Sequence, residues 1–333
     1  MEMTMAEMIE QFSKQLENSI SLFENIDIKY STEEINNIYI SGMGGSGIGG
    51  SIIKEIVRPT AGVPIEIGNT YHIPAYVSEN TLFIASSYSG NTEETLMSIN
   101  QALQKNAKII CITSGGKLED FAKLHKISLL KIPGELPSPR ACLGYSLVAN
   151  LFVMIKFGFI GDEMVQSLKL AISLIKYDQD EIKNKAFRIA EIIQDKTPII
   201  YTESRFGPIA MRIKQQINEN AKMHCWINVI PEMNHNEIVG WRTKDTGSAV
   251  IFLRSKDDFE KNVVRIEFTK KVISNYTDTI IDIYSKGKNL LEKSIYFIHL
   301  FDWVSWYLSE LRKVDAIEVS VIDLLKEELK NFD

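Results

Sequence analysis

The sequence has little cysteine, no excess of basic residues and no long apolar run, and each of these shortages excludes a class of protein. Its 333 residues include three cysteines and no C-x-x-C pair. We therefore expect reduced structural thiols rather than a disulfide framework or a redox motif. The formal net charge of −6 at pH 7 provides no basic surface for a nucleic acid.

Segments that would direct the chain to a membrane are also not expected. Residues 1–17 contain no basic stretch followed by an apolar one, so we expect no signal peptide there. The most apolar stretch, residues 145–160, contains Asn150 and Lys156 and is shorter than the roughly 20 residues that cross a bilayer. We predict that it forms a buried helix in a cytoplasmic, globular protein.

Glycine, by contrast, is concentrated in one short segment. Six of the twelve residues from Ile40 to Ser51 are glycine. A β-branched segment precedes them, and Ile52, Ile53 and Ile56 follow at helical spacing. The pattern predicts a strand that turns through glycines into the N-terminus of a helix. Free backbone N–H groups and the helix dipole favour an anion at such a turn.

Two anions fit this turn. Gly42, Gly44 and Gly47 satisfy the G-x-G-x-x-G pattern of dinucleotide sites. Glu66, at the end of the next predicted strand, would then be the ribose ligand. The alternative is a monophosphate, for which the candidate ligands are the amides of Gly45 and Gly47 and the hydroxyl of Ser46.

A second loop of short hydroxyl side chains favours the monophosphate. It follows a predicted strand at 81–85, and its candidate phosphate ligands are Ser87, Ser89 and Thr92. An ordinary helix cap, with Asn91 and Glu94 as a box-like pair, would explain the same residue types. A dinucleotide site, however, has no need of a second such loop one βαβ unit away. We therefore favour a bound monophosphate.

The order of predicted elements repeats along the chain. We predict an amphipathic helix over 3–25, and then an alternation of strands and helices typical of a parallel α/β sheet. A charged helical connector leads to a second unit, in which residues 202–207 stand where the glycine-rich turn stood in the first. The predicted fold class is α/β, with two tandem domains that are each a parallel sheet flanked by helices. The predicted boundaries are 1–29 for the N-terminal helix, 30–155 for the first domain, 156–193 for the connector and 194–333 for the second domain with its C-terminal helices. The predicted strands of the first domain are 36–41, 64–67, 81–85, 108–112 and 127–132, and those of the second include 197–202, 249–253 and 279–284.

Both loops carry motifs of a known family. Met43-Gly-Gly-Ser46 and Ser87-Tyr-Ser-Gly-Asn-Thr-Glu-Glu-Thr95 resemble signatures of the sugar isomerase (SIS) family, and more narrowly of the bifunctional phosphoglucose/phosphomannose isomerases. The resemblance extends over nearly the whole chain. It implies two SIS domains, a sugar phosphate bound at the loops of the first, and an aldose–ketose isomerisation that needs no metal ion or organic cofactor.

Such a reaction needs a carboxylate to move a proton, an acid/base group to open the sugar ring and a cation near the enediolate oxygens. The candidate carboxylate is Glu219, near the end of a helix predicted over 208–222. A charged residue that lies off the apolar stripe of a helix is more often only solvated. The segment from Asn218 to Lys222 nevertheless resembles the family's Asn-Glu-Asn-x-Lys motif, which implies that Glu219 is the base.

The candidate for ring opening is His235, in a polar loop after a predicted apolar strand. Asn234 and Asn236 on either side of it are expected to fix the tautomer of its imidazole. A zinc site made of His224, Cys225 and His235 would not have the spacing of a standard site. The resemblance implies that His235 is contributed to the active site of a neighbouring subunit, and hence that the chain forms a homodimer.

Two cations match further motifs of the family. Arg140 ends a loop stiffened by three prolines, and the resemblance implies that it stabilises the enediolate. Lys326 matches a terminal Ile-x-x-Leu-Lys motif, whose lysine reaches the ring oxygen or a hydroxyl of the sugar in relatives. The chain departs from the family just before this motif, because Asp315-Ala316 stands where relatives usually have Asp-Pro.

The predicted function is the isomerisation of glucose 6-phosphate, and of mannose 6-phosphate, to fructose 6-phosphate through a cis-enediol. One alternative is a sugar-phosphate-binding regulator, but such regulators usually carry a DNA-binding module, and the sequence has no basic helix-turn-helix. The others are an amino-sugar-phosphate isomerase and a nucleotide-dependent oxidoreductase. The expected partners are the sugar phosphate and a second copy of the chain, with no nucleic acid and no membrane.

Overall fold

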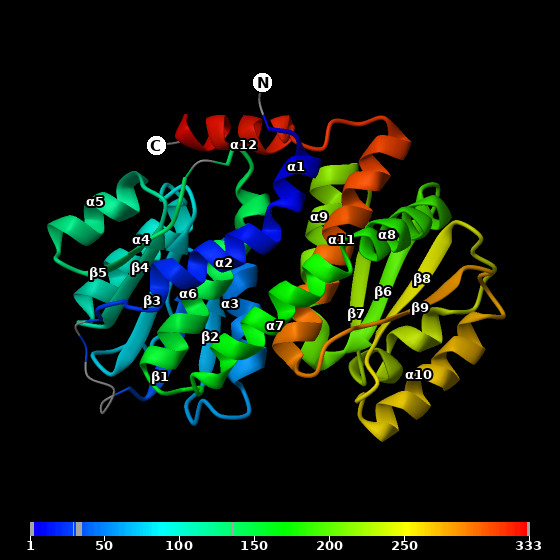
Figure 1. Cartoon of the computed structure of the whole chain (residues 1–333), viewed down its shortest axis with the longest axis horizontal. Helices are drawn as coiled ribbons and strands as arrows, with labels where there is room; N and C mark the ends of the chain where they lie inside the picture. The colour runs from blue at the N-terminus through cyan, green and yellow to red at the C-terminus, as the bar shows by residue number, and fades with distance from the viewer. Residues whose placement is uncertain (1–2, 29, 31–34, 135, 332–333) are drawn as a thin grey trace.

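The computed structural model describes residues 3–28, 30, 35–134 and 136–331. It contains two parallel β-sheets with a layer of helices between them (Figure 1). The first, sheet A, has the strand order β2-β1-β3-β4-β5. Its central strand β3 is buried at every residue, which is why it reads in the sequence as a continuous apolar run. The strands are β1 (Asn37–Ser41), β2 (Ile65–Gly68), β3 (Thr81–Ser87), β4 (Lys108–Thr113) and β5 (Ser128–Lys131), and the helices that follow β1, β3 and β4 are α3 (Gly44–Val57), α4 (Glu93–Gln104) and α5 (Gly116–Leu124).

The second sheet, sheet B, has the strand order β7-β6-β8-β9, and all its neighbouring strands are also parallel. This is the order of the first four strands of sheet A, so the predicted repeat of one α/β unit is confirmed. The strands are β6 (Thr197–Glu203), β7 (Trp226–Ile230), β8 (Ser248–Arg254) and β9 (Ile280–Tyr284), and the helices after β6 and β8 are α9 (Gly207–Ala221) and α10 (Glu260–Ile273).

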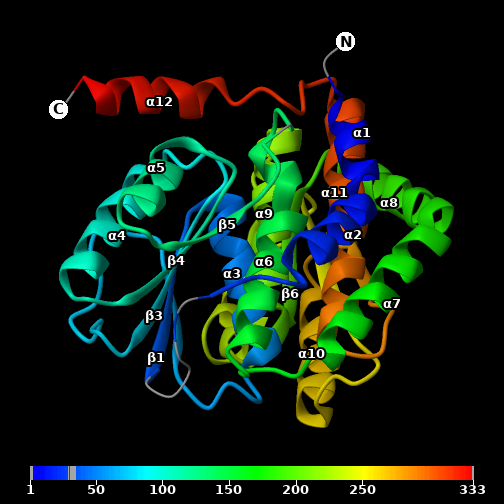
Figure 2. The ribbon, with the colours of Figure 1, turned by 60° about the vertical axis from the view of Figure 1, so that its left-hand side comes forward.

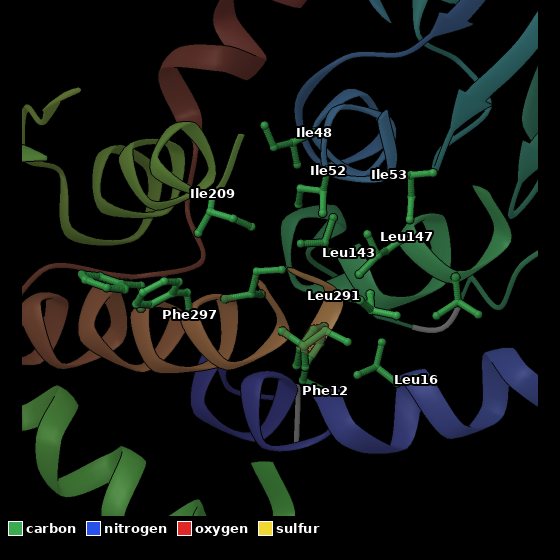
Figure 3. Close-up of a cluster of buried hydrophobic side chains, with 14 of the residues drawn as sticks. Phe12, Leu16, Ile48, Ile52, Ile53, Leu143, Leu147, Ile209, Leu291 and Phe297 are labelled. Atoms are coloured by element: carbon green, nitrogen blue, oxygen red, sulfur yellow. The ribbon is translucent and has the colours of Figure 1, made fainter. Parts of the chain in front are cut away.

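The helices between the sheets share one apolar core. Figure 3 shows side chains of α2, α3, α6, α9 and α11 meeting there, from Phe12 and Leu16 to Ile209 and Phe297. The apolar stretch 145–160 supplies most of α6, which is buried along almost its whole length, as predicted. Besides α3 and α9, the helices of this layer are α1 (Met5–Glu10), α2 (Phe12–Phe23), α6 (Leu143–Lys156), α7 (Glu163–Tyr177), α8 (Gln179–Ile193) and α11 (Leu290–Arg312).

The structure differs from the sequence-based expectation at the two ends of the chain. The single helix expected over 3–25 is divided at Gln11 into α1 and α2. The boundary predicted at 29 and 30 adjoins Lys29, which lies outside the described residues. At the other end, α12 (Ser320–Lys330) extends away from the body of the ribbon in Figure 2, and it buries none of its residues.

The two sheets present opposite ends to the same region. A helix that follows a parallel strand runs back along the sheet, so α3 begins at the carboxyl end of sheet A and α9 ends at the amino end of sheet B. Helices α3 and α9 pack against each other. The loops at the carboxyl end of sheet A can therefore share a site with the last turn of α9. No helix within the described residues is both long enough and apolar enough to cross a membrane.

Candidate active site

Two glycines allow β1 to turn directly into α3. A Cβ atom on Gly47 would lie 2.3 Å from the carbonyl oxygen of Gly42, so only a glycine fits there. The N–H groups of Ser46 and Gly47 donate to the carbonyl of Met43 at 3.1 and 3.2 Å. The first amides of a helix have no carbonyl partner inside it, so Gly45 presents its N–H at this end of α3. Of the two amides predicted to bind phosphate, that of Gly47 is already engaged within the turn.

The second loop keeps its hydroxyl groups together. The oxygens Ser87 Oγ and Thr92 Oγ1 are 2.8 Å apart, and the N–H of Gly90 donates to Ser87 Oγ at 3.1 Å. Ser89 is exposed, and its Oγ accepts from the N–H of Asn91 at 3.2 Å. Thr92 is the N-cap of α4, but its side chain makes no capping hydrogen bond. The structure therefore does not use this threonine as the ordinary cap that its position would also allow.

The two loops lie next to each other at the point where the strand order of sheet A reverses. Ser46 Oγ accepts a hydrogen bond from the N–H of Tyr88 at 3.2 Å, which joins them directly. Open α/β sheets bind ligands at this kind of switch point, here between β1 and β3. Glu66 is the second residue of β2 and accepts from the hydroxyl of Tyr76 at 2.7 Å. It is not at the carboxyl end of its strand, where a ribose ligand would be needed.

Arg140 lies beside the first of these loops, in the 3₁₀ turn η1 (Pro139–Cys142) that precedes α6. A Cβ atom on Gly45 would be 3.6 Å from the carbonyl oxygen of Pro139 and 3.8 Å from the Cα of Arg140. The arginine side chain is only 6% exposed. Burial lowers the pKa of its guanidinium, and the carboxylate of Glu219 opposes this shift.

Glu219 faces Arg140 from the last turn of α9. Its Oε2 is 3.7 Å from Arg140 Nη1, and its side chain is 31% exposed. The next residue, Asn220, accepts from Arg140 Nε at 2.7 Å. The structure thus brings together two of the four predicted catalytic side chains, next to the predicted phosphate loops. This carboxylate is not simply solvated, because a buried cation stands beside it.

Lys222 ties the same region to the segment between α11 and α12. Its Nζ donates to the carbonyls of Glu219, Asp315 and Glu318 at 2.6, 2.8 and 2.7 Å. Burial lowers the pKa of this ammonium group, and the carboxylate of Glu318 opposes the shift. Arg140 Nη2 also donates to this segment, at the carbonyls of Ala316 and Ile317. Two cations beside the site therefore hold the segment that leads to α12.

His235 is not brought to this site within one chain. It is exposed at the end of the 3₁₀ turn η3 (Glu232–His235), which follows the carboxyl end of β7. Glu219 lies at the other end of sheet B. The expectation that the flanking asparagines fix the imidazole tautomer is wrong, because the Nδ2 of Asn234 donates to Thr269 and that of Asn236 donates to Glu232. These amides hold the loop rather than the histidine.

Lys326 also lies away from the other candidates. It is on α12, where its Nζ pairs with Asp323 Oδ1 at 3.0 Å, and its side chain is 63% exposed. Helix α12 also carries large apolar side chains that are exposed rather than packed against another element. These are Val321, Ile322, Leu324, Leu325 and Leu329.

Sequence reasoning missed the buried polar side chains that support Arg140. Arg212 and Gln216 lie on α9 and Asp302 on α11, and all three are buried. Arg212 Nη2 donates to the carbonyl of Arg140 at 2.8 Å and to both carboxylate oxygens of Asp302 at 3.1 Å. The available signal was a pair of polar residues four positions apart on the face that carries Ile209 and Ile213.

Comparison with known proteins agrees with this architecture. Residues 33–134 match the model of the SIS domain, and residues 182–329 match that of the bacterial phospho-glucose isomerase C-terminal SIS domain. Among solved structures, the C-terminal domain of glucosamine-fructose-6-phosphate aminotransferase from Francisella tularensis has a TM-score of 0.80 at 16% identity. It covers 94% of this chain and 98% of its own. At that identity the similarity establishes the fold alone.

Sequence relatives are similar over almost the full length. A bifunctional phosphoglucose/phosphomannose isomerase from Caldicellulosiruptor bescii is 38% identical over 98% of this chain and 98% of its own. A D-glucosamine-6-phosphate 4-epimerase from Sulfolobus acidocaldarius is 30% identical over 87% of this chain and 88% of its own. With both SIS domains matched and a 38% identical relative aligned from end to end, the chain belongs to the bifunctional phosphoglucose/phosphomannose isomerase family.

Proposed function

We propose that this chain is an aldose–ketose isomerase that converts glucose 6-phosphate, and also mannose 6-phosphate, to fructose 6-phosphate and back. The proposal rests on one observation: a carboxylate and a buried guanidinium are paired beside the two loops that are predicted to bind phosphate. Glu219 Oε2 and Arg140 Nη1 are 3.7 Å apart, and Gly45 abuts the backbone of Arg140. Family membership supports the same reaction, because the relative from Caldicellulosiruptor bescii is named for both sugars.

The chemistry follows from the charges on these groups. The phosphate would be held by the amide of Gly45 and by hydroxyls of the two loops, which fixes the distance from C6 to the reacting end. The Glu219 carboxylate would take the proton from C2 of the open-chain aldose and return it to C1. Meanwhile the carbonyl oxygen at C1 gains a proton, and the hydroxyl at C2 loses its proton to become the ketose carbonyl. Arg140 Nη1 would face the negative charge that develops on these oxygens. Protein side chains supply the acid, the base and the cation.

We further propose a homodimer in which His235 opens the sugar ring in the site of the neighbouring subunit. The support is its geometry, since His235 is exposed on a loop at the opposite end of sheet B from Glu219. That loop is well anchored, because Glu237 accepts from the hydroxyl of Tyr201 and from Asn228. Lys326 would reach the sugar only if α12 takes a different position from the exposed one described above.

A second substrate class, the amino sugar phosphates, is supported by one of the relatives. The relative from Sulfolobus acidocaldarius is named for an epimerisation at C4 of glucosamine 6-phosphate. An activity on amino sugar phosphates is therefore the rival proposal for this site. In either case the reaction would belong to carbohydrate metabolism, and we propose that it takes place in the cytoplasm.

The test is an assay, in the presence of a metal chelator, that measures fructose 6-phosphate formation and also follows by NMR any other sugar phosphate that forms. Glucose 6-phosphate, mannose 6-phosphate and glucosamine 6-phosphate are supplied separately to the wild-type protein. The proposal predicts turnover of the first two. Turnover of the amino sugar alone would favour the rival, and binding of all three without turnover would point to a regulator.

A further inference from the structure

We propose that Asn220 is a positioning residue, which holds the guanidinium of Arg140 in the one orientation that leaves Nη1 facing Glu219. The inference rests on the proposed isomerase function, and it adds a residue to which no role has so far been given. Asn220 is completely buried at the last turn of α9, between the arginine and helix α11. It does not have to touch the substrate to act in this way.

The neighbours of Arg140 accept hydrogen bonds from some of its N–H donors and leave others free. A guanidinium has five N–H groups, one on Nε and two on each terminal nitrogen. The Nε–H donates to Asn220 Oδ1 at 2.7 Å. Nη2 donates to the carbonyls of Ala316 and Ile317, the latter at 3.0 Å. Among the described residues Nη1 alone has no hydrogen-bond acceptor, and it is the nitrogen that lies 3.7 Å from Glu219 Oε2.

The amide of Asn220 is itself held in one orientation. Its Nδ2 donates to Ser305 Oγ at 2.9 Å, and the hydroxyl of Ser305 donates to the carbonyl of Asp302 at 2.7 Å. Because the proton of this hydroxyl is committed, Ser305 can only accept from the amide. A flipped amide would place two oxygens against each other on one side and two N–H donors on the other. Asn220 Oδ1 must therefore point at Arg140.

Burial of these side chains prevents water from replacing the hydrogen bond between Asn220 and Arg140. Arg140, Asn220 and Ser305 are all nearly inaccessible to water, so no solvent molecule can replace a lost partner cheaply. The backbone of Arg140 is fixed separately, because its carbonyl accepts from Arg212 Nη2 at 2.8 Å. If Asn220 is removed, the backbone of Arg140 and the hydrogen bonds of its Nη2 are kept, but the guanidinium plane can tilt about Nη2 because its Nε–H has lost its acceptor. Nη1 would then no longer have a fixed place beside Glu219.

The first experiment compares Asn220→Ala with Asn218→Ala in steady-state kinetics on glucose 6-phosphate. Asn218 is a matched control, because its Nδ2 donates to the carbonyl of Met223 at the same helix end and does not contact Arg140. We expect Asn220→Ala to lower kcat by about 10- to 100-fold with little change in KM, because the phosphate loops are intact. The control should keep its kcat. Equal losses in the two variants would mean that both act only on the stability of α9, and would overturn the proposal.

If Asn220→Ala does not fold, Ser305→Ala removes only the hydroxyl that orients the amide. It should lower kcat in the same direction by a smaller factor. An unchanged kcat in Ser305→Ala would show that the amide needs no support, and would contradict the argument for its orientation.

A binding measurement separates this inference from the proposed function. The aldonate 5-phospho-D-arabinonate carries a phosphate and a carboxylate that imitates the charged enediolate, whereas sorbitol 6-phosphate carries the phosphate alone. By titration calorimetry, Asn220→Ala should bind the aldonate at least about tenfold more weakly than the wild type and sorbitol 6-phosphate equally well. Equal weakening of both ligands would overturn the positioning role. A wild-type protein that prefers neither ligand would overturn the proposed function as well.

Discussion

The central helix α11 contains a buried histidine, His299, and its burial favours the uncharged imidazole. Its side chain is 1% exposed, it stacks on Phe12 with 5.8 Å between ring centroids, and Trp303 Nε1 donates to its Nε2 at 3.3 Å. Its Nε2 also lies 2.7 Å from Gln179 Oε1, so two groups compete for this nitrogen, and it is the burial of the ring that favours the neutral form. Burial lowers the pKa of His299 to about 3.

This depressed pKa makes stability depend on pH. In the unfolded chain the imidazole titrates near its ordinary value of about 6.5, so the stabilisation is complete above that pH and is lost as the pH falls toward 3. Between pH 7 and pH 5 we expect the wild type to lose about 2 kcal/mol more unfolding free energy than His299→Gln, measured by urea denaturation. Parallel pH profiles for the two proteins would contradict the assignment.

At the scale of elements, the two repeats differ at the switch point, where the strand order of the sheet reverses. In sheet A the switch point between β1 and β3 is lined by glycines and hydroxyl groups. In sheet B the equivalent point is filled by ionic contacts of Arg205, whose Nε is 2.8 Å from Glu203 and whose Nη2 is 3.1 Å from Asp257. Asp257 in turn pairs with Lys293 at 2.6 Å. Residues 202–207 contain a single glycine, Gly207, and charged side chains occupy this point, so within the described residues the glycine- and hydroxyl-lined loops belong to the first repeat.

Elements that local sequence determines were predicted, whereas features that depend on contacts between distant elements were not. The start of helix α11 is defined locally, because the side chain of its N-cap, Asn289, accepts from the N–H of Glu292. The eight strands for which a range was predicted lie within two residues of that range. The pairing of Arg212 with Asp302 and the detached position of α12 were not predicted. Both depend on which distant elements meet, and periodicity alone cannot determine that.

The segment between α11 and α12 should open when Lys222 is changed. In Lys222→Met the three carbonyl oxygens of Glu219, Asp315 and Glu318 lose their shared donor. Lys222 is partly exposed and Arg140 keeps its own hydrogen bonds to the segment, so we expect a net loss of only about 1.4 kcal/mol of local stability and cleavage within 313–319 that is faster by on the order of tenfold.

The matched control is Lys326→Met, which removes a lysine that pairs only with Asp323 on its own helix. Its cleavage rate should stay at the wild-type value. If both variants are cut at the same rate, Lys222 does not hold the segment.

At the scale of the whole molecule, the two units face opposite ways around one helical core. The carboxyl end of sheet A meets the last turn of α9, while the carboxyl end of sheet B carries His235 away from that site. One chain therefore brings Glu219 and Arg140 together and leaves its histidine to another surface. The proposed symmetric dimer would bring that surface to the site of the second chain.

Mixing two inactive variants tests that arrangement. His235→Ala and Glu219→Gln are unfolded and refolded together in equal amounts, so that about half of the dimers contain one chain of each. If His235 serves the neighbouring site, each mixed dimer has one intact site, and the mixture should recover about a quarter of wild-type activity. If His235 serves its own chain, every site lacks one group and the mixture stays inactive.

The central claim is that Glu219 carries the proton between C2 and C1. The most direct measurement follows glucose 6-phosphate labelled with deuterium at C2, by NMR of the fructose 6-phosphate that forms. The wild type and the control Glu310→Gln, an exposed glutamate of α11, should place part of the deuterium at C1 and lose the rest to water. Glu219→Gln should form product at least about 100-fold more slowly while still binding sorbitol 6-phosphate. Wild-type turnover and deuterium transfer in Glu219→Gln would contradict the account.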